Sequence, residues 1–152
     1  MTKTKTNPKI YSLHTEADLT QDFRNYNLYN LALKYINGIK KDVRLLDVGA
    51  GAGEFLSLLP KSVKGFGVEP SPKLRQLAQS KFSVEISFDN IDSIKDTYDV
   101  ITMFDVLEHI ENDWTFLKRV VQLLNDNGLL IIAVPSLQFL YGKRDYVTGH
   151  YR

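Results

Sequence analysis

The nine residues LLDVGAGAG, at positions 45–53, decide the fold class of this chain. An apolar, β-prone run ends there in three glycines, Gly49, Gly51 and Gly53, which alternate with alanine. Glycine permits the tight turn that leads from a strand into a helix, and it lets a ligand approach the backbone closely. The first N–H groups of the following helix have no partner within the helix and can bind that ligand. We therefore expect a strand, a ligand-binding turn and a helix in succession.

The rest of the chain alternates between helical and β-prone patterns. Apolar residues at helical spacing predict helices over residues 20–39 and 112–124, and Ser71 followed by Pro72 is typical of a helix start. This alternation predicts an α/β fold with a doubly wound parallel sheet. The predicted strands are residues 43–48, 63–68, 82–87, 98–104 and 129–134.

The composition limits the class of protein. With 152 residues the chain fits one domain, which we place at residues 18–152 after an N-terminal arm of residues 1–17. Its 19 basic and 18 acidic side chains nearly balance, so we expect no nucleic-acid partner. No apolar run is long enough to span a membrane, and the polar N-terminus is unlike a secretory signal. The absence of cysteine excludes disulfides and thiolate metal sites. A cytoplasmic location is the expectation.

The spacing of the glycines indicates the kind of ligand. A dinucleotide-binding turn has the spacing G-x-G-x-x-G and holds a pyrophosphate at the helix start. Here Gly53 comes one residue too early and Glu54 follows it, and a carboxylate would repel a pyrophosphate. This pattern disfavours a nicotinamide-dependent dehydrogenase. Asp47, just before the glycines, can instead accept hydrogen bonds from an ammonium group, which suits a ligand with an amino-acid end.

A second acidic residue, Glu69, ends the next predicted strand. A carboxylate at this place can accept two hydrogen bonds from the neighbouring hydroxyls of a ribose. The alternatives without function are a solvated acid for Glu69 and an empty tight turn for the glycines. Because both features follow successive strands, we favour the ribose role.

Four motifs, in the order of the family, resemble those of the class I S-adenosylmethionine-dependent methyltransferases. They are LLDVGAGAGEFL (residues 45–56), VEPS (68–71), YDVITMFDVLEH (98–109) and GLLIIAVPS (128–136). The resemblance covers roughly residues 43–136. It is strongest to the small-molecule branch that includes quinone-type and sugar-pathway O-methyltransferases.

The resemblance implies S-adenosylmethionine as the cofactor and methyl transfer to an oxygen of a small-molecule acceptor. It places Asp47 near the amino group of the cofactor, Glu69 on its ribose and Asp89 near its adenine. The full set of implied cofactor-binding residues is Asp47, Gly49, Ala50, Gly51, Gly53, Glu69, Pro70, Asp89, Phe104 and Asp105. The alternative function is a module that binds the cofactor without catalysing transfer.

The segment after the fourth predicted strand carries Asp105, Glu108 and His109, which would share a face of a helix. One interpretation makes His109, with Glu108, the catalytic pair, because an imidazole can take a proton from an acceptor hydroxyl near neutral pH. A second is a divalent metal site formed by the three residues, with His150 as a further candidate, and oxygen ligands would favour magnesium or manganese. A third is a purely structural cluster.

The family sheet has seven strands, and a hairpin after the fifth strand completes one edge. The tail beyond residue 134 has no two further apolar runs, so we expect a C-terminally truncated, Rossmann-like sheet of five strands in the order 3-2-1-4-5. Segment 129–134 would then be an apolar edge strand, which invites pairing. Either the chain is a fragment that turns over poorly, or it covers this edge with its own tail or as a homodimer.

Overall fold

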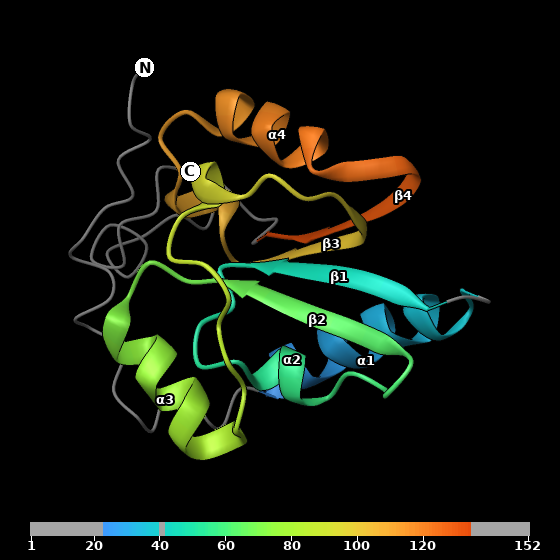
Figure 1. The fold of residues 1–152 in the computed structure, drawn as a ribbon, viewed down its shortest axis with the longest axis vertical. Helices are drawn as coiled ribbons and strands as arrows, with labels where there is room; N and C mark the ends of the chain where they lie inside the picture. The colour runs from blue at the N-terminus through green and yellow to red at the C-terminus, as the bar shows by residue number, and fades with distance from the viewer. Residues whose placement is uncertain (1–22, 40–41, 135–152) are drawn as a thin grey trace.

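The computed structural model of the chain describes residues 23–39 and 42–134 (Figure 1). Helices and strands alternate along most of this length, as the sequence predicts. In chain order they are α1 (Phe23–Asn37), β1 (Val43–Val48), α2 (Glu54–Ser57), β2 (Val63–Val68), α3 (Pro72–Phe82), the 3₁₀ turn η2 (Ile91–Ser93), β3 (Tyr98–Phe104), the 3₁₀ turn η3 (Leu107–His109), α4 (Asp113–Gln122) and β4 (Leu124–Ala133).

Within the described residues the sheet has four parallel strands in the order β2-β1-β3-β4. The expected five-stranded sheet in the order 3-2-1-4-5 is therefore wrong. The fold is a Rossmann-like α/β arrangement, and β1 lies between β2 and β3. The difference comes from residues 82–87, which were expected to form the outer strand beside β2.

The chain after α3 does not pair along β2 before Phe88, and its first residues finish the helix. Ser83 takes a left-handed conformation (φ 55°), and the N–H of Val84 donates to the carbonyl of Ala78 at 3.2 Å. Pairing with β2 is confined to a single bridge at Phe88. Its N–H donates to the carbonyl of Gly67, and its carbonyl accepts from the N–H of Glu69, both at 3.0 Å.

The strand β4 begins five residues before the predicted segment 129–134. Leu124 already pairs with Tyr98, and a register shift lets the chain pass through the turn that the sequence predicts before Leu129 pairs with Val100. Asn127 lies within this shift with a φ of 60°. The expected lack of a further strand hairpin, and the expected covering of the β4 edge by the tail or by a second copy, concern residues beyond 134, which lie outside the described residues.

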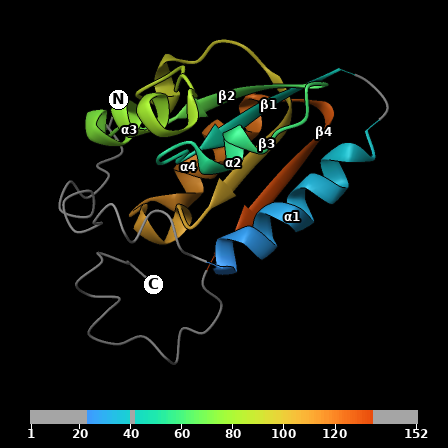
Figure 2. The ribbon, with the colours of Figure 1, turned by 90° about the horizontal axis from the view of Figure 1, so that it is seen from below.

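The two faces of the sheet are covered by different helices (Figure 1). On one face Ile36 of α1 and Phe55 of α2 pack against Leu45 of β1. On the other face Val120 of α4 packs in a cluster with Leu46 of β1. Leu129 and Ile131 of β4 pack against the same cluster as Ile36 of α1, on the face of the sheet that α1 covers (Figure 2). Among the described helices, none is both long enough and apolar enough to cross a membrane.

Candidate functional site

The strand order creates a crevice at the carboxyl ends of the central strands. From β1 the chain moves to β2 on one side, and it later returns to β3 on the other side. In open α/β sheets, ligands bind at this kind of switch point, outside the carboxyl ends of the strands. The glycine turn, Glu69 and Asp105 directly follow β1, β2 and β3, so the topology gathers them at this edge.

The glycine turn is held by the backbone and is open on one side. The N–H groups of Gly49 and Ala50 both donate to the carbonyl of Val68, at 2.8 and 2.9 Å. A Cβ at Gly49 (φ 77°) would collide with the side chain of Val106. A Cβ at Gly51 (φ 54°) would instead meet no atom within 4 Å. Gly51 therefore borders open space, where its missing side chain leaves room for a ligand.

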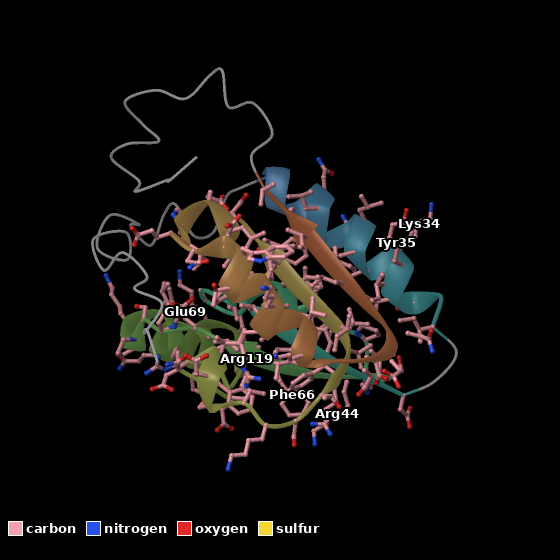
Figure 3. The ribbon with its side chains drawn as sticks, turned by 90° about the horizontal axis from the view of Figure 1, so that it is seen from above. Lys34, Tyr35, Arg44, Phe66, Glu69 and Arg119 are labelled. Carbon is pink, nitrogen blue, oxygen red and sulfur yellow. The ribbon has the colours of Figure 1, made fainter. Side chains whose placement is uncertain are left out.

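Glu69 connects this turn to the start of α3. Its Oε2 accepts from the N–H of Gly51 at 3.0 Å, and its Oε1 accepts from the N–H of Ser71 at 2.8 Å. Arg75 donates to the backbone carbonyl of Glu69 at 2.6 Å. The residue is 2% exposed, and Figure 3 shows it beside α3. Burial raises the pKa of Glu69, while the two backbone hydrogen bonds and the charge of Arg75 act in the opposite direction.

Asp47 is the second buried acid of the site. It is 3% exposed, and its Oδ1 accepts a hydrogen bond from the hydroxyl of Thr102 on β3 at 2.7 Å. Burial raises the pKa of Asp47 to about 7, against the hydrogen bond from Thr102 and with a further contribution from the charge of Glu69. A cation bound near Asp47 would lower this pKa, because a positive charge favours the ionised form of an acid.

At the end of β3 the chain turns sharply between two expected cofactor residues. The ring of Phe104 packs edge-on against Phe55 and Tyr29, with centroids 5.0 and 5.1 Å apart. Asp105 is half-buried and adopts a left-handed conformation with a φ of 53°. Its N–H donates to the carbonyl of Ala133 at 2.9 Å, which ties the ends of β3 and β4 together.

Asp105, Glu108 and His109 do not lie on one α-helix. Leu107–His109 form a single 3₁₀ turn, and the left-handed Asp105 precedes it. Glu108 is 2% exposed, whereas His109 is half-buried. In the part of the chain that the structure describes, no group of three acidic or histidine side chains could hold a metal ion. The magnesium or manganese alternative therefore has no support, and His150 lies outside the described residues.

The remaining predicted residues lie around this centre. Gly53 is the N-cap of α2, and a Cβ there would come within 3.0 Å of Ala78. Pro70 and Asp89 are exposed. Pro70 follows Glu69, and Asp89 follows Phe88. The N–H of Glu69 donates to the carbonyl of Phe88, which brings these two positions together beside β2.

Sequence reasoning missed Thr102 and Val106 as parts of the site. A hydroxyl within the otherwise apolar run VITMF was a usable signal, because a buried polar group needs a partner. Its partner could not be named without the register that places Thr102 opposite Asp47. Val106 gave no signal, since its contact with Gly49 depends on the turn after β3.

Comparison with known protein families gives one match over most of the chain. A family model described as a methyltransferase domain matches residues 28–151. Two similar curated proteins are ubiquinone biosynthesis O-methyltransferases, from Rickettsia canadensis (strain McKiel) and Rickettsia conorii (strain ATCC VR-613 / Malish 7). They are 30% identical over 125 residues and 32% identical over 127 residues. Each alignment covers 76% of this chain, but 50% and 41% of the relative, so the chain spans about half the length of these proteins.

Solved structures share the fold. The plantazolicin methyltransferase BpumL, in complex with a pentazolic desmethylPZN analog and SAH, superposes with a TM-score of 0.68 at 20% identity. The match covers 94% of this chain and 62% of that protein. At this level of identity the likeness establishes the shared architecture.

Proposed function

Because the chain belongs to the methyltransferase-domain family, we propose that it binds S-adenosylmethionine and takes part in O-methyl transfer to a small-molecule acceptor. The similar proteins that carry the name O-methyltransferase support the reaction type, and the SAH in BpumL supports the cofactor. The observation that carries the proposal is the position of Glu69. Its buried carboxylate lies against the N–H of Gly51, the residue that borders open space at the switch point of the sheet.

The chemistry of the crevice fits this cofactor. S-Adenosylmethionine carries positive charge on its sulfur and its amino group, and it offers two ribose hydroxyls as donors. The buried acids Asp47 and Glu69 supply negative charge and acceptor oxygens. A pyrophosphate would need the spacing G-x-G-x-x-G, which Gly49, Gly51 and Gly53 do not have, so a dinucleotide fits poorly.

The bound cofactor would supply a methyl group that is already activated by the positive sulfur. The chain then has to hold the reacting groups in line and exclude water, and this accounts for a large share of the rate in such reactions. The aromatic contacts of Phe104 fix the end of β3 where that alignment is needed. His109 is the proposed group that takes the proton from the acceptor hydroxyl. Glu108 is buried and is suited to hold the 3₁₀ turn that presents His109.

Two measurements test the proposal. Calorimetric titration with S-adenosylhomocysteine should give saturable binding, and NAD should give none. Transfer of labelled methyl groups to phenolic acceptors then tests catalysis. Binding without transfer to any acceptor would support the non-catalytic alternative, and failure to bind S-adenosylhomocysteine would refute the proposed function.

A further inference from the structure

We propose that Thr102 is a positioning residue for cofactor binding that acts through Asp47. The hydroxyl of Thr102 keeps the buried Asp47, just ahead of the glycine turn, as an ionised carboxylate. Only this form accepts hydrogen bonds through both oxygens, as the amino group of the cofactor requires. This inference rests on the proposed function. It adds a residue that is neither one of the glycines nor one of the acids of the four motifs.

The geometry fixes the pair tightly. Asp47 and Thr102 are direct register partners on the neighbouring strands β1 and β3. Directly opposed residues project from the same face of a sheet. Both are almost fully buried, with 3% and 0% of their surface exposed, and the hydroxyl donates to Oδ1 over 2.7 Å. Threonine is stiff at χ1, so the direction of its hydroxyl is set by the strand.

A neutral donor has an advantage at this position. A lysine or arginine would pair with the carboxylate and compete with the cationic end of the ligand. A hydroxyl stabilises the ionised acid without cancelling its charge. Without such a donor, burial would favour the neutral acid, and its proton would face an ammonium group that can only donate.

The protonation of Asp47 depends on this balance. Burial raises its pKa to about 7, and the hydrogen bond from Thr102 opposes that rise. Among the ionisable groups on adjoining elements, the acid Glu69 after β2 raises the pKa of Asp47 further. Arg75 donates a hydrogen bond to the backbone carbonyl of Glu69. The segment after β3 carries three more such groups: Asp105, Glu108 and His109.

Two ligands separate the role of Thr102 from a general effect on the site. S-Adenosylhomocysteine carries the amino-acid end, whereas 5′-methylthioadenosine has the same adenosine without it. Thr102→Val removes the hydroxyl and keeps the branched shape, and Thr102→Ser keeps the hydroxyl. Thr102→Ala provides the same loss if the valine variant does not fold.

We expect Thr102→Val to weaken S-adenosylhomocysteine about tenfold near pH 7, in line with a hydrogen bond to a charged group. The deficit should shrink at about pH 8.5, because a higher pH favours the ionised form of Asp47 even without the hydroxyl. Binding of 5′-methylthioadenosine should stay unchanged, and Thr102→Ser should restore affinity to within about threefold. In an Asp47→Asn background, the valine substitution should have no further effect.

Two results would overturn the inference. Equal loss for both ligands at both pH values would show that Thr102 only supports the structure. Unchanged binding of S-adenosylhomocysteine to Thr102→Val would show that the hydroxyl does not matter. If the unmodified protein binds neither ligand, the proposed function itself fails, which is a different result from either of these.

Discussion

Charged side chains at the two ends of the sheet have different partners. At the carboxyl end, the acids Asp47 and Glu69 are held by a hydroxyl and by backbone N–H groups. At the amino end, Arg44 forms an ion pair with Asp96 at 2.8 Å. Its guanidinium also lies over the ring of Phe66, at 5.2 Å (Figure 3), and over the ring of Tyr98, at 5.3 Å.

This difference separates stability from binding. At the amino end, Arg44 has an opposite charge and two rings beside it, and its hydrogen bond to Asp96 raises its pKa. At the carboxyl end, burial raises the pKa of both acids because their hydrogen bonds offset only part of the cost of desolvation. A cationic ligand would offset the rest. The carboxyl end therefore costs stability in the free protein and is suited to binding.

The largest expected effect is on stability, from Asp47→Asn. The pKa of an aspartate in an unfolded chain is about 3.9, and that of Asp47 in the folded protein is about 7. Between these values the folded state holds more protons, so stability falls as the pH rises from about 4 to about 7. The asparagine variant should be more stable than the wild type at about pH 8, by on the order of 2–4 kcal/mol. Urea denaturation at about pH 5 and pH 8 measures this.

Part of the pH dependence should remain in Asp47→Asn, because burial also raises the pKa of Glu69. Asp126→Asn, on the exposed turn within β4, is the matched control and should leave the pH dependence unchanged. If Asp47→Asn kept the full pH dependence of the wild type, Asp47 would not be a strained buried acid, and the contrast between the two ends would not hold.

The next effect is on affinity, from Glu69→Ala. This change removes the acceptors proposed for the ribose and also releases the N–H groups of Gly51 and Ser71. Hydrogen bonds to a charged group are worth roughly 1.5–3 kcal/mol each, so affinity for S-adenosylhomocysteine should fall at least about tenfold. The affinity for 5′-methylthioadenosine should fall equally, because it keeps the ribose. Calorimetry measures both.

Glu85→Ala provides the control for this experiment, since Glu85 is an exposed glutamate in the segment after α3. It should bind both ligands like the wild type. An unchanged affinity in Glu69→Ala would contradict the ribose assignment, while a loss for S-adenosylhomocysteine alone would move Glu69 to the amino-acid end of the ligand.

The sequence predicted the centre of the fold better than its edge. The predicted segments 43–48 and 98–104 agree with the central strands β1 and β3, because strands buried on both faces have dense apolar runs between clear turns. Segment 63–68 also agrees with β2, although this strand lies at an edge of the sheet and is buried mainly at its last two residues. Segment 82–87 alternates like a strand, but alternation does not say which backbone groups are free to pair. In the structure the N–H of Val84 is already used by the end of α3.

The candidate site shows the same limit. The glycines and Glu69 could be identified because they follow strands directly, and parallel strands bring their carboxyl ends together. The hydrogen bond from Gly51 to Glu69 spans 18 positions, and that from Thr102 to Asp47 spans 55. Such contacts depend on strand order and register, which local patterns do not contain. The prediction that Asp105, Glu108 and His109 share one face of a helix was wrong for a local reason, because Asp105 takes a left-handed conformation.

The smallest effect is expected at the amino end, from Arg44→Met. The ion pair with Asp96 is partly exposed, at 43% and 64% of the two side chains, so it contributes about 0–1 kcal/mol. The contacts of Arg44 with the two rings add about 0.5–1 kcal/mol. Methionine keeps the apolar packing of the stem, and unfolding in urea should show a loss of about 1 kcal/mol. Lys64→Met is the control, because Lys64 also lies over the ring of Phe66, at 5.3 Å, but is exposed, whereas Arg44 is half-buried. Affinity for S-adenosylhomocysteine should stay unchanged in both variants, since the carboxyl end of the sheet is left intact. A loss of affinity in Arg44→Met without one in Lys64→Met would mean that the two ends of the sheet are coupled, and that stability and binding are not divided between them.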